Sequence, residues 1–471
     1  MLLRLINPSF FYCFALVCST VVLFPLQSCF SESLEALSQS LEGTLQVPSS
    51  TGVVVADIQT GQVIYQKNGQ KLLKPASVLK LLTTATAFEK MGPGYRFRTP
   101  ILVAGLRGSR AEVLTLQGAG DPSFTVEDLW TIARRIRSRG IRSIGQLVLD
   151  GGGVIQGIDR SGQRAYQAGT SALPLNFNTI AFELCPGAVG QPAKVSVDPP
   201  EYPIEIVGAI RTISKGTGQY GVDEFPGSDS NGGPAKFRVT GTLGQRVACV
   251  TVYRSISNPE HYLGIVFRSL LDDQGVRIES GPFIRPTGAS SQLLFYHESK
   301  SLADIIRDLN HYSSNFVAEQ IVLALSAHKR DQPAQHGRGL QEMASFLRRL
   351  NIEEPGLSLH DGSGLSHDNR ISALALTKLL LHVVQQEDYS VEFQNSLAVG
   401  ARSGTLRRRS LPGVVRAKTG TLTGVTALGG FISSQQGRRF AFVILQNNAR
   451  SRANAFRFEE RLLGILRSAK L

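Results

Sequence analysis

The sequence predicts an α/β (α+β) body that is interrupted by a large β-rich insertion. A strand pair followed by an apolar helix stands near the start of the chain. The helical period returns after residue 296 and gives way to strands and a last helix. Between these parts, short β-like runs alternate with breaks rich in Gly, Pro and Ser. This order is typical of a mixed body that carries an inserted unit.

Local patterns place the elements of the body in chain order. Two strands are expected around a turn at Thr60-Gly61, and a helix is expected to end at the Gly-Pro-Gly of 92–94. The remaining body consists of a helical region, a run of strands and a closing helix. The expected ranges are 51–70 for the strand pair, 77–90 for the first helix, 301–329 for the helical region, 414–447 for the strands and 456–469 for the last helix.

The chain is long enough to hold two or three domains with cores of their own, because it has 471 residues of which 42% are hydrophobic. The α/β body is expected to comprise 30–97 and 296–471. The β-rich insertion is expected to comprise 98–295.

The first 29 residues predict a secretory signal peptide. Arg4 precedes an apolar run over 10–26, and small and polar residues follow. An uncleaved membrane anchor is the alternative, but the run is short for a span and is broken by Pro25. The segment "LQSC" also resembles a lipoprotein cleavage box in which Cys29 would be lipidated. We therefore expect export, with lipid association of the membrane left open.

The net charge of +13 favours an anionic neighbour, such as a cell-envelope polymer or nucleic acid. The chain has no P-loop and no zinc-finger spacing, and its arginines are dispersed. Charge alone therefore decides little, and no nucleic-acid partner is predicted.

Two cysteines, Cys185 and Cys249, remain after the predicted leader. An exported protein could join them in a disulfide. Two separate buried thiols are the alternative, because the sequence does not show whether the residues are close.

Ser77 and Lys80 form a candidate catalytic dyad at the start of the first helix. Pro75 suits the first helical turn, and Lys80 lies on the same helix face as Ser77, one turn further on. A serine hydroxyl is a poor nucleophile until a base takes its proton. A lysine can be that base only if desolvation or a nearby positive charge lowers its pKa, and the apolar run here would bury it.

Competing candidates are weaker. A second serine-x-x-lysine, Ser326 to Lys329, falls at the end of a helix, where the dipole has the wrong sign, and we expect it to be solvated surface. Ser363 in "DGSGLS" is a rival candidate nucleophile, but it lacks the G-x-S-x-G frame and an adjacent base. We expect this segment to form a tight loop near the site. The histidines show no H-E-x-x-H spacing, so no metal is expected.

Two further motifs make Ser77 credible, and at this point the chain resembles a known family. Ser313-x-Asn315 and Lys418-Thr419-Gly420 follow the serine-x-x-lysine in the order found in penicillin-binding proteins and serine β-lactamases. The long gap before Ser313 resembles that of the D-alanyl-D-alanine carboxypeptidase/endopeptidase family, the class C low-molecular-weight penicillin-binding proteins. Similar stretches stand at 118–125, 171–178, 361–370 and 404–409.

The resemblance implies a fold and a set of roles. The body would be a penicillin-binding-protein/serine β-lactamase-like catalytic domain, with Ser77 as the nucleophile, Lys80 as the general base and Ser313 as a proton relay to the leaving amine. The backbone N–H groups of Ser77 and Thr421 would form an oxyanion hole. Substrate binding would fall to Asn315, Lys418, Thr419, Gly420 and Thr421. No cofactor is implied.

The resemblance also implies the function. We expect a serine-type D-Ala-D-Ala carboxypeptidase of the bacterial periplasm or cell envelope that acts on peptidoglycan stem peptides and is acylated by β-lactam antibiotics. Endopeptidase activity on cross-links and the oligomeric state are left open. The alternatives are a β-lactamase-like serine hydrolase, which "EPGLS" at 354–358 faintly favours, and a non-catalytic penicillin or muropeptide sensor.

Overall fold

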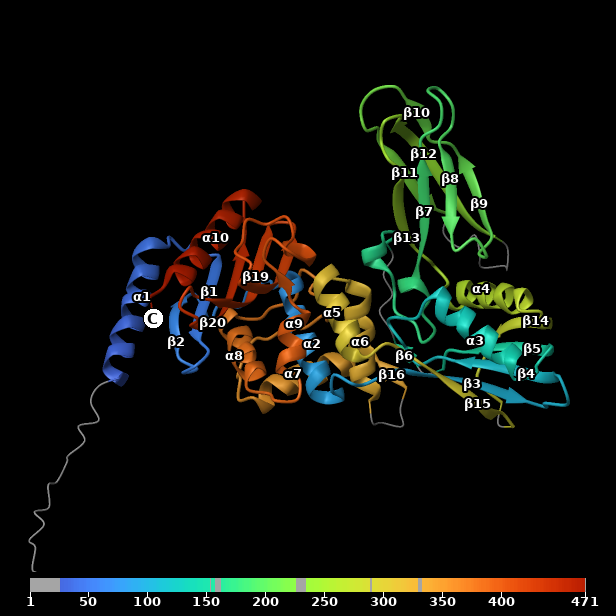
Figure 1. Cartoon of the computed structure of the whole chain (residues 1–471), viewed down its shortest axis with the longest axis horizontal. Helices are drawn as coiled ribbons and strands as arrows, with labels where there is room; N and C mark the ends of the chain where they lie inside the picture. Colours follow the sequence, from blue (N-terminus) through green and yellow to red (C-terminus); the bar gives the residue numbers. More distant parts are fainter. Residues whose placement is uncertain are drawn as a thin grey trace, which may run out of the picture.

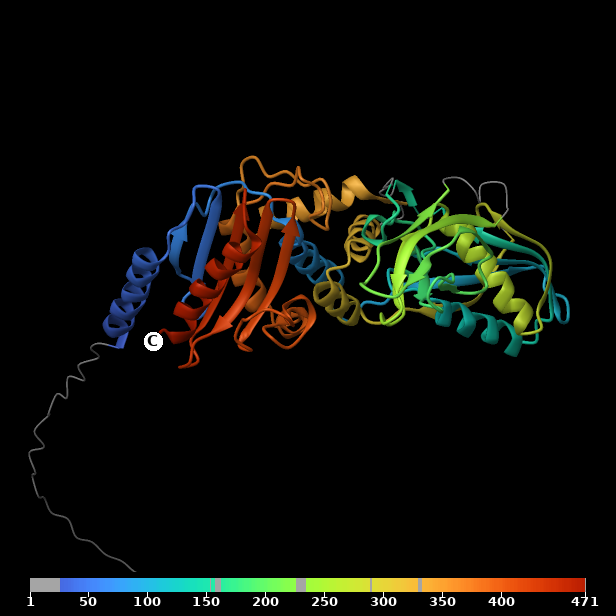
Figure 2. The same ribbon diagram turned by 90° about the horizontal axis from the view of Figure 1, so that it is seen from above.

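The protein is elongated and consists of two lobes that lie side by side (Figure 1). The structure, a computed structural model, describes residues 26–152, 154–156, 162–225, 234–288, 290–328 and 333–470. One lobe is built from the two ends of the chain, and the other is built from its middle (Figures 1 and 2). Figure 1 shows the helices α5 (Leu302–Tyr312) and α6 (Asn315–Ala327) at the junction of the two lobes.

The first lobe is organised around a six-stranded antiparallel sheet with the order β17-β18-β19-β20-β1-β2. Its central strands are apolar along their whole length because both faces are covered. In β20, Phe440 and Phe442 face one core, whereas Ala441 and Val443 face the other. The strands are β1 (Thr51–Asp57), β2 (Val63–Lys67), β17 (Ala398–Val399), β18 (Val415–Leu422), β19 (Val425–Ser433) and β20 (Arg439–Asn447).

Helices cover the two faces of this sheet. Side chains of α1 (Leu26–Thr44) and α10 (Arg452–Ser468) share a core with one face. The other face is covered by α8 (Ala373–Val384) and, beyond it, by α2 (Lys80–Met91).

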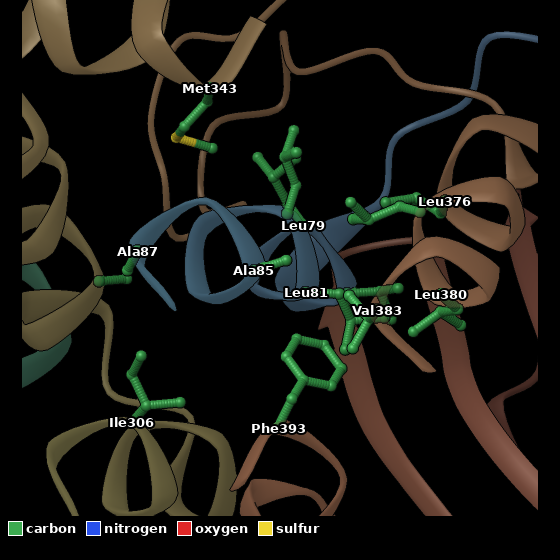
Figure 3. Packing of buried hydrophobic residues seen from close by; sticks show 14 of the residues in the cluster. Leu79, Leu81, Ala85, Ala87, Ile306, Met343, Leu376, Leu380, Val383 and Phe393 are labelled. Carbon is green, nitrogen blue, oxygen red and sulfur yellow. The ribbon is translucent and has the colours of Figure 1, made fainter. Parts of the chain in front are cut away.

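Helix α2 lies at the centre of the helical layer, and its residues from Lys80 to Phe88 are all buried. It follows the short 3-10 turn η1 (Ala76–Leu79). Side chains of η1 and α2 pack against α5, α7 (His336–Arg349), α8 and α9 (Ser390–Ser396) (Figure 3). The segment that carries the candidate residues Ser77 and Lys80 therefore also forms the middle of the core.

The second lobe has a hydrophobic core of its own and contains a five-stranded sheet with the order β14-β5-β4-β3-β15. It also contains a three-stranded sheet, β13-β7-β8, and a four-stranded sheet in which β12 pairs with β9, β10 and β11. A two-residue strand, β16 (Ala334–Gln335), pairs with β6 (Val154–Gln156). The other strands are β3 (Arg98–Ala104), β4 (Arg110–Gln117), β5 (Ser143–Asp150), β7 (Thr179–Cys185), β8 (Lys194–Asp198), β9 (Ile204–Gly208), β10 (Arg211–Ile213), β11 (Tyr220–Glu224), β12 (Ala235–Gly244), β13 (Val250–Ser255), β14 (Arg277–Ile284) and β15 (Gln292–Glu298).

Two helices of this lobe were not predicted, namely α3 (Val126–Ser138) and α4 (Pro259–Asp273). Their signals are present in the sequence. A capping box joins Thr125 to Asp128 at the start of α3, and Asn258 caps α4 with proline as the first helical residue. The β-like texture around both segments concealed these local signals.

The structure decides between the two alternatives for the cysteines. Cys185 at the end of β7 and Cys249 before β13 form a disulfide across a pair of antiparallel strands. Two separate thiols are therefore excluded.

The predicted leader lies outside the described residues except for 26–29, which open α1. Cleavage of the leader and lipidation of Cys29 stay predictions. Within the part of the chain that the structure describes, no helix combines the length and the apolar character needed to cross a membrane.

The disulfide should contribute strongly to stability because it closes a loop of 64 residues. Chain-entropy arithmetic for this loop gives about 4 kcal/mol. We expect the Cys185→Ser/Cys249→Ser variant to lose most of that amount, as measured by urea unfolding of the second lobe. A reductant should destabilise the native protein and leave the double variant unchanged. Equal unfolding free energies of the two proteins would contradict this role.

Candidate active site

The structure brings Ser77 and Lys80 into contact. Ser77 lies in the 3-10 turn η1, Lys80 opens α2, and Lys80 Nζ lies 2.9 Å from Ser77 Oγ. Ser77 is half-buried, whereas Lys80 is fully buried. Directly before the serine, Ala76 adopts a φ of 46°, a conformation that L-residues avoid and that occurs mainly where surrounding structure imposes it. The dyad is therefore held in one geometry by its backbone.

Two other segments complete the surroundings of Lys80. Its Nζ lies 2.8 Å from Asn315 Oδ1, at the first residue of α6, and 2.6 Å from the carbonyl oxygen of Ser363. An ammonium group has three donors, and together with Ser77 these partners accept all of them. If Lys80 loses a proton, its nitrogen can instead accept one from the Ser77 hydroxyl.

Lys418 forms a second buried amine close to the first. It lies on β18, its side chain is fully buried, and its Nζ is 2.8 Å from Ser313 Oγ and 2.9 Å from the carbonyl oxygen of Thr419. Burial, and then the neighbouring charge of Lys80, hold the pKa of Lys418 well below its usual value. Protonating both Lys80 and Lys418 is therefore unfavourable unless an anion binds beside them.

Ser313 and Asn315 reach these two lysines because the chain turns sharply between α5 and α6. Ser313 ends α5 with a φ of 59°, in the left-handed region, and Ser314 caps α6 by accepting from Val317 N. This turn directs Ser313 to Lys418 and Asn315 to Lys80.

Strand β18 lies directly against the backbone of the candidate nucleophile. A Cβ added to Gly420 would stand 2.9 Å from Pro75 O and 3.0 Å from Ser77 N, so only glycine allows this approach. Thr419 Oγ1 is hydrogen-bonded to Thr405 Oγ1 at 2.8 Å, and Thr421 is exposed at the end of the strand. All eight candidate site residues therefore gather on η1, α2, the α5–α6 turn and β18.

The loop 361–366 is an additional part of the site, and its predicted position near the site is confirmed. Ser363 contributes its backbone carbonyl, not its hydroxyl, to Lys80. Gly364 has a φ of +79°, and a Cβ there would stand 1.9 Å from the carbonyl oxygen of Ala76. The loop thus contacts both the amine of the dyad and the backbone beside the nucleophile.

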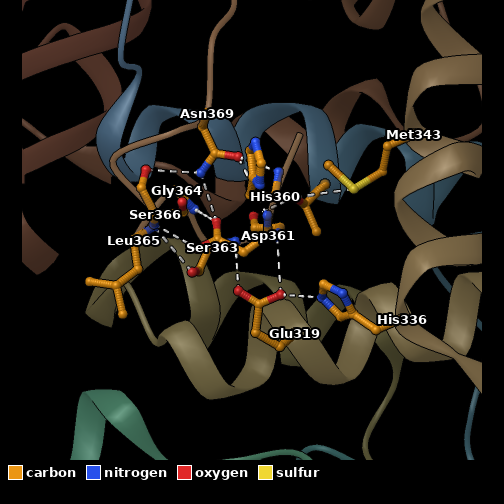
Figure 4. Close-up of polar contacts among 12 residues, drawn as sticks. Glu319, His336, Met343, His360, Asp361, Ser363, Gly364, Leu365, Ser366 and Asn369 are labelled. Carbon is orange, nitrogen blue, oxygen red and sulfur yellow. Dashed lines mark hydrogen bonds and ion pairs between the residues drawn. The ribbon is translucent and has the colours of Figure 1, made fainter. Parts of the chain in front are cut away.

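Glu319, which was not among the residues predicted for the site, anchors this loop. Its buried carboxylate accepts hydrogen bonds from the backbone N–H groups of Gly362 and Ser363 and lies 2.9 Å from His336 Nε2 (Figure 4). The available signal was the helical spacing, because Glu319 stands four residues after Asn315 and lies on the same helix face.

The second lobe also reaches the site. Asn315 Nδ2 lies 3.3 Å from the carbonyl oxygen of Tyr166. The buried amide of Gln320 on α6 accepts from Ser171 N and donates to the carbonyl oxygens of Ser171 and Gly120. The two lobes are therefore joined along the helix that begins with Asn315.

The expectation that the second serine-x-x-lysine is solvated surface is wrong for its serine. Ser326 does lie near the end of helix α6, but its side chain is fully buried. Its hydroxyl oxygen accepts a hydrogen bond from Gln335 N. The hydroxyl packs there because the chain folds back to begin α7. Lys329 lies outside the described residues.

Among the described residues, one group of candidate metal ligands comes together, namely Glu183, Cys185 and Cys249. Both sulfur atoms of this group are joined in the disulfide, so neither is a thiolate ligand. The group lies in the second lobe and does not belong to the lysine cluster.

Comparison with known proteins places these features in a family. The model of the D-Ala-D-Ala carboxypeptidase 3 (S13) family matches residues 35–467. A D-alanyl-D-alanine carboxypeptidase of Actinomadura sp. (strain R39) is 31% identical over 445 residues, which covers 88% of this chain and 81% of the relative. A D-alanyl-D-alanine carboxypeptidase DacB of Haemophilus influenzae is 25% identical over 412 residues, which covers 84% of this chain and 85% of the relative.

Solved structures share the fold. The crystal structure of penicillin binding protein 4 from Haemophilus influenzae superposes with a TM-score of 0.78 at 24% identity, which covers 92% of this chain and 99% of that one. A predatory peptidoglycan endopeptidase from Bdellovibrio bacteriovorus gives a TM-score of 0.52 at 15% identity, which covers 90% of this chain and 95% of that one. The predicted α/β class with a β-rich addition is confirmed.

The lowered pKa of Lys418 predicts a stability that depends on pH. The unfolded chain binds this proton more tightly than the folded protein does, so the protonated Lys418 lowers the free energy of unfolding at pH values below 10.5. This destabilisation fades as the pH rises toward 10.5, the usual pKa of the group. We expect Lys418→Met to unfold at a higher temperature than the native protein near neutral pH and to lose this advantage near pH 10.5. Melting curves across pH test this, with Lys236→Met on β12 as the control, because the side chain of Lys236 is partly exposed and pairs with Glu205. A Lys418→Met protein that is less stable at every pH would contradict it.

Proposed function

The chain belongs to the D-Ala-D-Ala carboxypeptidase 3 (S13) family of serine peptidases, and from this premise we propose which residues perform the reaction and on which substrates. The observation that carries the proposal is the contact of 2.9 Å between Ser77 Oγ and Lys80 Nζ within a buried cluster. The substrates are peptidoglycan stem peptides that end in D-Ala-D-Ala.

In the proposed reaction, Ser77 Oγ attacks the carbonyl carbon between the two D-alanines while its proton passes to Lys80 Nζ. The tetrahedral intermediate breaks its C–N bond while the proton held by Lys80 passes to the leaving amine by way of the Ser313 hydroxyl, so that D-alanine departs and Lys80 is neutral again. Water then attacks the ester carbonyl of the acyl-enzyme and regenerates Ser77. Lys80 removes the proton from this water as the base and returns it to Ser77 Oγ as the ester C–O bond breaks.

The base role of Lys80 is supported by its neighbours. Lys80 is fully buried beside a second amine, that of Lys418, whose pKa burial and the charge of Lys80 hold well below its usual value. The carboxylate of the substrate would favour a protonated Lys418 and thereby disfavour a second proton on Lys80. Asn315 Oδ1 and the Ser363 carbonyl then fix the direction of the free amine.

Substrate binding is assigned to the edge formed by β18. Lys418, Thr419 and Thr421 would bind the terminal carboxylate, and Gly420 lets the peptide lie close to Ser77. The backbone N–H groups of Ser77 and Thr421 would stabilise the oxyanion, a contribution of about 3 kcal/mol per donor in other enzymes. Asn315 would bind the amide of the substrate.

A β-lactam presents a reactive carbonyl beside a carboxylate, as the D-Ala-D-Ala terminus does. We therefore include acylation of Ser77 by penicillins in the proposal. A structure of penicillin binding protein 4 from Haemophilus influenzae was solved in complex with a β-lactam, and it shares the fold at a TM-score of 0.74.

The second lobe, proposed as an inserted domain over 98–295, would position the polymeric substrate. Support comes from the contact of Tyr166 with Asn315 and from the net charge of +13, which suits an anionic cell-wall polymer. The sequence of 1–29 supports export to the periplasm or cell envelope, with peripheral or lipid association of the membrane through Cys29 as a further part of the proposal.

Two other functions fit the site less well. In a β-lactamase, a second base would have to reach the acyl-enzyme, but Glu354 accepts from Ser372 Oγ, at the start of α8. A sensor would not need the contacts that hold Lys80 against Ser77. Release of D-alanine from a pentapeptide separates both from a peptidase, and a cross-linked dimer assayed beside it decides the endopeptidase preference.

Ser77→Ala should lose penicillin labelling and D-alanine release, because no hydroxyl remains beside Lys80 to form the acyl-enzyme. Fluorescent-penicillin gels and a D-alanine assay measure the two losses. Ser326→Ala is the matched control, since it removes a buried serine from the other serine-x-x-lysine and should label normally. Labelling of Ser77→Ala at the native level would place the nucleophile elsewhere.

Lys80→Arg should be almost inactive although it keeps a positive charge, because a guanidinium does not release its proton near neutral pH. Acylation rates with a chromogenic β-lactam measure the loss. Lys90→Arg, in the last turn of the same helix and paired there with Glu342, serves as the control and should acylate normally. A Lys80→Arg variant with a native acylation rate would rule out the base role.

A further inference from the structure

We propose that Glu319 is a positioning residue for the acylation step, which it supports by holding the Ser363 carbonyl against Lys80. This inference rests on the proposed function, since it concerns the orientation of the proposed base. Glu319 acts through the loop 361–366, whose backbone it binds at Gly362 and Ser363.

The carboxylate of Glu319 is fully buried and uses both oxygens. Oε1 accepts from Ser363 N at 3.0 Å, and Oε2 accepts from Gly362 N at 3.0 Å (Figure 4). His336 Nε2 lies 2.9 Å from Oε2, and a carboxylate oxygen accepts, so Nε2 is the donor. Three donors from two segments thus converge on one carboxylate inside the core.

The residue held by Glu319 is the same residue that binds the proposed base. Ser363 donates its N–H to Glu319 and accepts from Lys80 Nζ, at 2.6 Å, with its carbonyl oxygen. A change in the position of Ser363 would therefore change the direction of the Lys80 amine relative to Ser77.

Helix α6 orients Lys80 from two sides. Asn315 accepts from Lys80 directly, and Glu319, one turn later on the same face, fixes the Ser363 carbonyl. Thr83, one turn after Lys80 on α2, donates to the carbonyl oxygen of Gly362 at 2.6 Å. The loop is thus held between the helix that carries the base and the helix that carries its partners.

A carboxylate is required at this position because Gly362 N, Ser363 N and His336 Nε2 all donate to it. Glutamine has the same shape, but one end of its amide is a donor and would meet a backbone N–H. A donor left without an acceptor in a buried site costs about 1–3 kcal/mol, and the loop can relieve that cost only by moving. A movement of the loop would also displace the backbone of Ala76, because Gly364 packs closely against its carbonyl oxygen.

The test is the pre-steady-state acylation of the full chain by a chromogenic β-lactam, which separates the acylation rate constant from the dissociation constant of the non-covalent complex. In Glu319→Gln we expect the rate constant to fall about 10- to 100-fold, as displacement of a reacting group by a fraction of an ångström does. The dissociation constant should change less than about twofold, because the groups that bind the β-lactam carboxylate stay in place.

A loss of structure alone would give a different result. It would lower the fraction of protein that labels and leave the rate constant of that fraction unchanged. His336→Phe keeps a ring of similar size and removes the third donor, so it should lower the same rate constant by a smaller factor. It also tests the inference if Glu319→Gln does not fold. Glu342→Gln on α7 is the matched control, because it removes a carboxylate paired with Lys90 outside the site.

Native rate constants in the folded variants of Glu319 and His336, beside a Ser77→Ala protein that does not label, would overturn this inference and leave the proposed function standing. Labelling of Ser77→Ala would overturn the proposed function instead. A parallel increase of the dissociation constant in Glu319→Gln would also overturn the positioning role, because it would assign the residue to substrate binding.

Discussion

The active-site region depends on the burial of one amine, that of Lys80, which is fully buried in the middle of the hydrophobic core. An unpaired ammonium in such a place is strongly destabilising, so its donors must be met by acceptors from the protein. Ser77, Asn315 and the Ser363 carbonyl supply them from three segments. Folding the core and assembling the site are therefore the same event.

Helix α6 connects this site with the rest of the molecule. Its first residue, Asn315, contacts Lys80, and its buried Glu319 holds the loop that contacts Lys80 from the other side. Its next residue, Gln320, binds the backbone of the second lobe at Ser171 and Gly120. Glu319 and Gln320, which are consecutive on α6, thus contact the loop beside Lys80 and the second lobe, respectively. The contact between the lobes therefore helps to hold the site in place.

Short-range patterns predicted much of the fold and of the candidate site. The strand pair near the start, the helix that begins at Lys80 and the strand that carries Lys418 all follow from local periodicity and capping. Glu319 was missed because a glutamate in a helix is usually solvated, and only a packed loop turns it into a buried anchor. Ser326 was misjudged for the same reason, because burial of a helix end depends on where the chain goes next.

The sequence by itself predicted the dyad, because a spacing of three residues places Ser77 and Lys80 about one turn apart on the same helix face. It also determined the order of the motifs and, through them, the resemblance to a family. Only the tertiary structure decided that Cys185 pairs with Cys249, that Lys418 approaches Lys80, and that Ser363 offers a carbonyl where a hydroxyl was considered. These contacts join residues far apart in the chain, and their distances are set by the packing of whole helices and sheets, which no local pattern encodes.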